Sequence, residues 1–101
     1  MAQFDIYQNT NNKTKGKVPY FMDIQHELLS QLPTRVVIPL FNNANPIKKL
    51  NPKFTIENRS VILASDEVTS IPKYLLEKKV TNLSQHRDEI IASIDFLITG
   101  F

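Results

Sequence analysis

The sequence predicts a mainly β fold, in which short antiparallel strands form a small barrel or sheet that one C-terminal α-helix closes. Short stretches of β-branched and aromatic residues recur along the chain, and polar loops separate them. The long helical periodicity falls in residues 84–99. A length of 101 residues is typical of one domain with a modest core, so we expect residues 1–101 to form a single domain.

The first quarter of the chain predicts a β-hairpin. Gln3–Tyr7 alternates polar and apolar residues with a period of two, which indicates a strand. Asn9–Lys17 is a polar and basic loop, after which the apolar pattern resumes in Val18–Gln25. His26–Gln31 then predicts a short helical or irregular crossing.

Arg35–Leu40 is the most strand-like segment, because its β-branched residues pack well on a pleated surface. Proline cannot donate to a strand ladder, so we expect this strand to end at Pro39 or to lie at a sheet edge there. The polar segment Asn42–Pro52 predicts a second loop.

A second hairpin is predicted from Lys53–Glu57 and Arg59–Ser65, which flank Asn58. Asparagine tolerates the left-handed backbone conformation that such a turn requires. Residues 71–80 predict a further short strand or turn that leads to the C-terminal helix.

The C-terminal helix has helix-start signals at its beginning. Ser84 is a good N-cap, and Asp88 and Glu89 lie early, where the helix dipole favours negative charge. Its apolar residues recur with helical spacing and form one stripe. The stripe consists of Ile90, Ile94, Leu97, Ile98 and Phe101. We expect the first three to face the core and the last two to lie on a dimer or partner surface.

Composition restricts the class of protein. The chain has no apolar run near the ~20 residues that a membrane span needs, and its first residues lack the pattern of a signal peptide. The absence of cysteine fits a reducing compartment, so we expect a soluble cytoplasmic protein. The net charge of +2 is too small to indicate direct binding of nucleic acid. Residues 1–53 carry +4 and residues 54–101 carry −2, which would suit an acidic partner for the first half.

Residues that could carry catalysis are scarce. The chain has no cysteine nucleophile, and its two glycines cannot form a phosphate-binding loop. His26 and His86 are too far apart in the sequence for metal-ligand spacing. We therefore expect no enzymatic activity, no metal and no cofactor.

Several short motifs, in their order and spacing, make the chain similar to the CcdB toxin family. They are Gln3–Tyr7, Phe21–Gln25, Val36–Leu40, Ser70–Pro72, Asn82–Ser84 and the penultimate Gly100. The resemblance covers nearly the whole chain. It implies a homodimeric SH3-like barrel with a C-terminal helix, acting as the toxin of a toxin–antitoxin pair and associated with plasmid maintenance. It also implies that the toxin binds the A subunit of DNA gyrase and traps gyrase on cleaved DNA, and that a CcdA-like antitoxin neutralises it.

The resemblance further implies which residues contact gyrase. They are Thr99, Gly100 and Phe101 at the end of the chain, Leu28 and Leu29 in the crossing, and Asp95 on the helix. The family has a large aromatic residue where this chain has Thr99. We expect Phe101 to supply the missing ring, because an aromatic face beside a guanidinium is stabilising. Gly100 permits close backbone approach, although a glycine is also common as a helix C-cap.

The two basic loops are candidates for antitoxin binding, since a disordered acidic segment would be attracted to them. Their lysines are Lys13, Lys15, Lys17, Lys48 and Lys49. Two solvated loops without a binding role would have the same composition.

Two other functions are compatible with this fold. A MazF-type endoribonuclease has the same barrel, but it needs clustered basic and hydroxyl groups to handle phosphate. Arg35 and Arg59 are the only arginines in the strand region, and they form no evident cluster in the sequence. The third possibility is an antitoxin-binding protein whose toxicity is lost, because the family's aromatic residue is absent.

Overall fold

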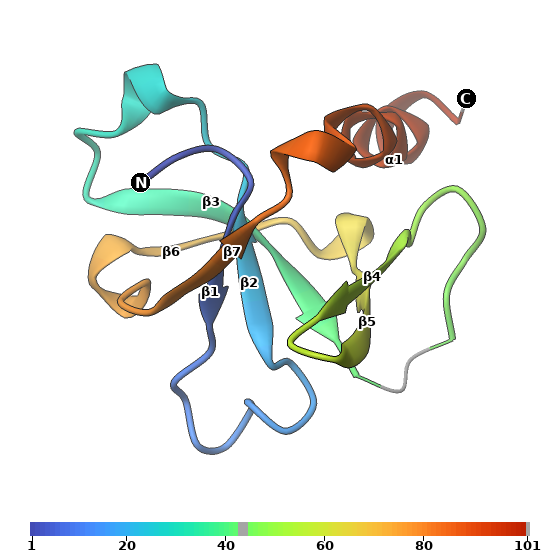
Figure 1. Ribbon diagram of the computed structural model, residues 1–101. Coiled ribbons are helices and arrows are strands. Elements are labelled where there is room, and N and C mark those ends of the chain that lie inside the picture. The colour runs from blue at the N-terminus through green and yellow to red at the C-terminus, as the bar shows by residue number, and fades with distance from the viewer. Residues whose placement is uncertain (43–44, 101) are drawn as a thin grey trace.

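The computed structural model describes residues 1–42 and 45–100. Within those residues, seven strands form one curled antiparallel sheet, a half-barrel that α1 (Arg87–Thr99) covers at one end (Figure 1). The predicted mainly β fold with a C-terminal helix is confirmed. The strands are β1 (Asp5–Gln8), β2 (Tyr20–Asp23), β3 (Thr34–Phe41), β4 (Lys53–Ile56), β5 (Arg59–Leu63), β6 (Thr69–Pro72) and β7 (Lys79–Asn82). Their order in the sheet is β4-β5-β3-β2-β1-β7, and β6 also pairs with β3.

The first predicted hairpin is confirmed: β1 and β2 pair antiparallel, with Ile6 opposite Met22. β1 begins two residues later than predicted, because Phe4 has a φ of 72° and so cannot continue an extended strand. The predicted crossing contains a 3-10 helix, η1 (Glu27–Leu29). His26 caps it, since its Nδ1 accepts the Leu28 N–H at 3.1 Å.

The expectation that the third strand ends or lies at an edge at Pro39 is wrong. β3 runs on to Phe41 and lies between β2 and its other neighbours, β5 and β6. On that second side, Thr34–Val37 pair with β6, whereas Leu40 and Phe41 pair with β5. Pro39 falls between the two ladders, so its missing N–H leaves both of them intact.

The second predicted hairpin, β4–β5, is confirmed, with Ile56 opposite Arg59. Glu57 and Asn58 form its two-residue turn, with φ of 52° and 62°. Positive φ at both positions is the type I′ geometry that matches the twist of paired strands. Between β5 and α1 the chain forms β6, β7 and three 3-10 helices: η2 (Ser65–Glu67), η3 (Lys73–Leu75) and η4 (Ser84–His86).

The main hydrophobic core lies between the concave face of the sheet and α1. Its buried members come from β1–β5, from α1 and from the segments that precede β1 and η4. They are Phe4, Ile6, Tyr20, Met22, Ile38, Leu40, Phe54, Ile56, Val61, Leu63, Leu83 and Ile90.

Ser84 is not the N-cap of the C-terminal helix, contrary to the prediction. Residues 84–86 form η4 before the α-helix starts at Arg87. Asn82 instead supplies the local side-chain acceptor, because its Oδ1 accepts the Ser84 N–H at 2.7 Å. Asp88 and Glu89 do lie in the first turn of α1, as predicted.

The buried face of α1 is shorter than predicted. Ile90 is fully buried, and Ile94 packs against the core as expected. Ser93 is also buried and lies 2.7 Å from the Ser65 hydroxyl of η2. The expectation that Leu97 faces the core is wrong: it is 42% exposed, because the last turn of α1 extends beyond the elements that it packs on (Figure 1).

Candidate functional site

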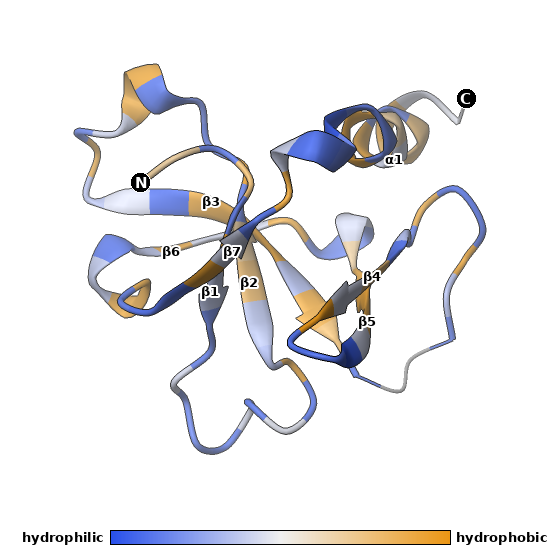
Figure 2. Ribbon diagram, viewed as in Figure 1, coloured by the Kyte–Doolittle hydropathy of each residue, from blue (hydrophilic) through white to orange (hydrophobic). Residues whose placement is uncertain are grey.

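The end of α1 exposes apolar side chains to solvent. Ile98 is 75% exposed, next to the exposed Leu97, and Figure 2 shows hydrophobic residues in this part of the helix. We call residues 97–100 the C-terminal surface. Exposed apolar patches of this kind mark interaction sites more often than isolated surface residues do.

Gly100 ends the helix in the left-handed conformation, with φ 78° and ψ 15°, and its N–H donates to the Phe96 carbonyl at 2.9 Å. It is therefore a helix C-cap. A Cβ built on Gly100 would meet nothing within 4 Å, so the space around it is open to a partner. Thr99 donates its hydroxyl to the Asp95 carbonyl at 2.7 Å, while Phe101 lies outside the described residues.

Leu28 and Leu29 in η1 are 86% and 51% exposed. Figure 1 shows η1 and the C-terminal end of α1 on opposite sides of the molecule. Within one chain, the residues that the family resemblance assigns to gyrase binding therefore form two separate surfaces. Gln25 attaches η1 to the sheet: its Nε2 donates to the Leu29 carbonyl at 2.7 Å, and its Oε1 accepts the Val36 N–H at 3.0 Å.

Arg35 is fully buried and bonded to Asp23. Its Nη2 and Nε donate to Asp23 Oδ2 at 2.6 and 3.0 Å, and neither side chain is exposed. Burial raises the pKa of Asp23 above its ordinary value, although the hydrogen bonds from Arg35 act in the opposite direction. The sequence analysis named Arg35 only as one of two arginines in the strand region and missed this pair, because no local pattern indicates which face of a strand a lone arginine occupies.

The five lysines proposed for antitoxin binding are exposed, and they lie in two loops. Lys13, Lys15 and Lys17 belong to the β1–β2 loop, whereas Lys48 and Lys49 belong to the β3–β4 loop. Figure 1 shows the two loops projecting from different parts of the molecule. The lysines therefore form two basic surfaces.

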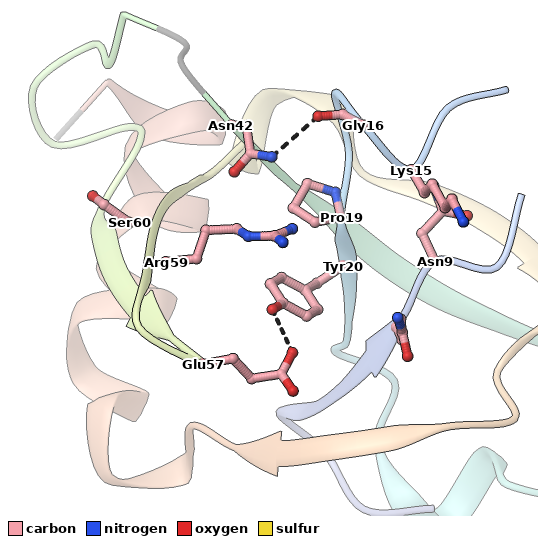
Figure 3. A pocket seen from close by; sticks show the side chains of 10 residues that line it. Asn9, Lys15, Gly16, Pro19, Tyr20, Asn42, Glu57, Arg59 and Ser60 are labelled. Atoms are coloured by element: carbon pink, nitrogen blue, oxygen red, sulfur yellow. Dashed lines mark hydrogen bonds between the residues drawn. The ribbon is translucent and has the colours of Figure 1, made fainter. Parts of the chain in front are cut away.

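A polar cleft of about 710 Å³ lies between the β1–β2 loop and the β4–β5 hairpin (Figure 3). Tyr20 donates its hydroxyl to Glu57 Oε1 at 2.6 Å, and the Arg59 guanidinium lies 5.9 Å from the centre of the Tyr20 ring. Burial raises the pKa of Tyr20 to about 12, and the hydrogen bond to Glu57 acts in the same direction. The lining residues are Gln8, Asn9, Lys15, Gly16, Pro19, Tyr20, Asn42, Glu57, Arg59 and Ser60.

Sequence reasoning did not find this cleft. Tyr20 and Glu57 are 37 residues apart and come together only because β3 joins the two hairpins in one sheet. The turn at Asn58 was the available signal, since a type I′ turn brings its flanking side chains close together.

In the part of the chain that the structure describes, no three histidine, aspartate or glutamate side chains are grouped to hold a metal ion. None of the described helices is long and apolar enough to cross a membrane.

The fold is that of small barrel toxins with a C-terminal helix. A solved structure described as an endoribonuclease in complex with its cognate antitoxin, from mycobacterial species, superimposes with a TM-score of 0.78. The match covers 97% of this chain and 94% of that chain at 9% sequence identity, so it shows a common fold alone. No curated protein matches the sequence.

The model of the family described as CcdB protein matches residues 3–100. The chain therefore belongs to the CcdB family, and this membership makes it a toxin of the toxin–antitoxin class with an antitoxin as its partner.

Proposed function

We propose that this toxin binds the A subunit of DNA gyrase through the C-terminal surface and traps gyrase on cleaved DNA, and that a CcdA-like antitoxin neutralises it in the cytoplasm. The observation that carries the proposal is the end of α1, where Ile98 is 75% exposed and Gly100 closes the helix with open space around it. A partner can bury this apolar area and approach the glycine backbone closely.

The proposed active form is a homodimer, with Ile98 and Phe101 near its two-fold axis. Such a dimer would place two copies of the C-terminal surface side by side as one composite patch. It would also allow Leu28 and Leu29 in η1 of one protomer to lie beside the C-terminal surface of its partner. The two surfaces that are separate within one chain would then form one gyrase-binding surface.

The burial of Arg35 removes one of the two arginines of the strand region from any phosphate-handling site. A phosphate-handling site needs accessible cations, and Arg35 is fully buried and paired with Asp23. Arg59 then remains as the exposed arginine of the described strands.

A cleavage assay with purified gyrase tests the proposal. The toxin is incubated with gyrase, ATP and supercoiled plasmid, and linear DNA is measured after denaturation; single-stranded RNA is incubated with the toxin in parallel. We expect linear DNA to accumulate with wild type and not with Ile98→Asp, while the RNA stays intact. Cleaved RNA without trapped DNA would favour the endoribonuclease, and neither product would indicate a toxin that has lost its activity.

A further inference from the structure

We propose that the polar cleft binds a carboxylate side chain from an acidic peptide segment, with Arg59 as the anchoring cation. The inference rests on the proposed neutralisation by an antitoxin, because the antitoxin would supply this segment. It adds a binding site outside the basic loops and names the chemical group that the site takes.

One contact orients Arg59 in the cleft. Its guanidinium lies over the ring of Tyr20, and the Tyr20 hydroxyl is fixed by the 2.6 Å hydrogen bond to Glu57. The ring itself is buried, so the platform beneath Arg59 is rigid. A cation that is positioned in advance loses less side-chain freedom when it binds a ligand.

Arg59 also has donors available for a ligand. Among the described residues, no carboxylate lies within the 4.0 Å of an ion pair with Arg59, although Glu57 is two positions away. Glu57 is engaged at the hydroxyl of Tyr20, whereas Arg59 covers the ring (Figure 3). A guanidinium fork matches the two oxygens of a carboxylate, which makes such a pair directional as well as favourable.

The opposite wall adds a second cation. Lys15 lines the cleft from the β1–β2 loop and is exposed, with Lys13 and Lys17 in the same loop (Figure 3). Asn42 closes this end of the cleft, because its Nδ2 donates to the Gly16 carbonyl at 3.1 Å. An incoming anion would therefore meet positive charge on both walls.

The mixed chemistry of the cleft favours a peptide over a nucleic acid strand. Glu57 would repel the successive phosphates of a nucleic acid strand, whereas a peptide can direct a single carboxylate to Arg59 and Lys15 and away from Glu57. A peptide offers N–H donors to Glu57 and to the side-chain oxygens of the lining amides, together with a carboxylate for Arg59. The volume of about 710 Å³ can hold a few side chains of such a segment.

A double-mutant cycle with the full-length toxin and its cognate antitoxin tests the proposal. We expect Arg59→Gln to weaken antitoxin binding roughly tenfold to hundredfold, since a hydrogen bond to a charged group contributes about 1.5–3 kcal/mol. Changing one antitoxin Asp or Glu to Asn or Gln should weaken binding by the same factor. The toxin and antitoxin variants combined should bind no more weakly than either variant alone. Arg87→Gln is the matched control, because Arg87 lies 5.9 Å over the Phe4 ring but outside the cleft. Thermal unfolding of each variant shows whether it folds.

The outcomes separate this inference from the proposed function. If the wild-type toxin binds antitoxin and Arg59→Gln, folded, binds it equally well, the cleft proposal is overturned and the proposed function stands. If Arg59→Gln weakens binding but no antitoxin acid couples to it, the carboxylate assignment is overturned. If the wild type does not bind antitoxin, the cleft proposal and the proposed neutralisation are both overturned, and the proposed gyrase binding is not affected. If an RNA oligonucleotide binds and Arg59→Gln abolishes that binding, the cleft is a nucleic acid site and the peptide proposal is wrong.

Discussion

The Asp23 carboxylate and the Arg35 guanidinium form an ion pair at 2.6 Å in which neither side chain is exposed. The pair joins β2 to β3, and Arg35 also donates to the Gln25 carbonyl at 3.4 Å, just before η1. Within the described residues, Arg35 Nη1 is a buried side-chain nitrogen without a hydrogen-bond partner. The pair is fully buried, so the loss of either member would leave an unpaired charge in the interior.

We expect Asp23→Asn to lower the free energy of unfolding by about 3–5 kcal/mol, because it leaves the Arg35 charge buried and unpaired. Urea unfolding followed by circular dichroism measures this loss. The control is Lys79→Met, which removes a cation that is 54% exposed from its 3.2 Å contact with Asp5. That variant should lose at most about 1 kcal/mol. Equal losses in the two variants would contradict the account.

Asp5 gives the fold a specific acid sensitivity. Burial alone would raise the pKa of Asp5, but hydrogen bonds from Asn82, Ala2 and Lys79 outweigh it and hold the pKa below the ordinary 3.8. Its charged form therefore stabilises the folded state above pH 3.8, and this contribution is lost as the pH falls through the folded pKa. We expect Asp5→Asn to be less stable than wild type at pH 7 and to lose less stability on acidification. Urea unfolding at several pH values measures the difference, and parallel pH curves would contradict it.

A substitution at Gly100 is expected to abolish gyrase binding without unfolding the protein. Gly100→Val places a β-branched residue at φ 78°, which costs about 1–3 kcal/mol, but the position lies at the end of the helix and its Cβ meets nothing within 4 Å. The barrel should therefore stay folded while binding to gyrase is lost. Gly16→Val is the control, since that glycine also has open space but lies in the β1–β2 loop. Equal gyrase binding by both variants would remove Gly100 from the interface.

The aromatic group that contacts gyrase is predicted to come from Phe101. Thr99 turns its hydroxyl to the Asp95 carbonyl and has no ring to offer. We expect Phe101→Ala to weaken binding to the gyrase A dimerisation domain roughly twofold to thirtyfold, as the loss of a 0.5–2 kcal/mol cation–π contact would. Thr99→Ala should change it little. Titration calorimetry measures both, and the reverse ranking would show that position 99 carries the contact.

The basic loops should act on the rate of antitoxin association. Changing Lys13, Lys15 and Lys17 together to Gln should slow association at low salt and flatten its dependence on ionic strength, because the Debye length over which exposed charges act falls from about 30 Å at 0.01 M to about 10 Å at 0.1 M salt. Lys78→Gln is the single-site control, an exposed lysine before β7. Stopped-flow measurements at increasing salt test the expectation. Association that is independent of salt in wild type would indicate loops without a binding role.

Local patterns predicted the elements whose geometry is set by neighbouring residues. The Asn58 turn is an example, because a left-handed φ favours asparagine, and Ile90 is another, because it lies on the apolar face of a helix. Pro39 and Leu97 were mispredicted for one reason. Whether a proline interrupts a ladder, or a helix turn is covered, depends on elements that are distant in the sequence.

The sites were predicted unevenly for the same reason. The apolar end of α1 could be read from the helix stripe, and Ile98 is exposed there, while its role in a dimer or partner surface stays a prediction. The polar cleft and the buried Arg35 could not be predicted from the sequence. Tyr20 contacts Glu57, and Asp23 contacts Arg35, only once distant segments come together in the folded sheet.

The most direct test of gyrase targeting is a titration of the toxin into the isolated dimerisation domain of gyrase A, with wild type and Ile98→Asp compared at the same concentrations. Ile98 is 75% exposed in the single chain, so the variant should fold normally, and the molar mass of both proteins in solution shows whether the proposed dimer is retained. The account predicts saturable binding by wild type and at least a tenfold weaker affinity for Ile98→Asp, about 1.4 kcal/mol. Absence of binding by folded wild type, or equal affinity in the two proteins, would contradict it.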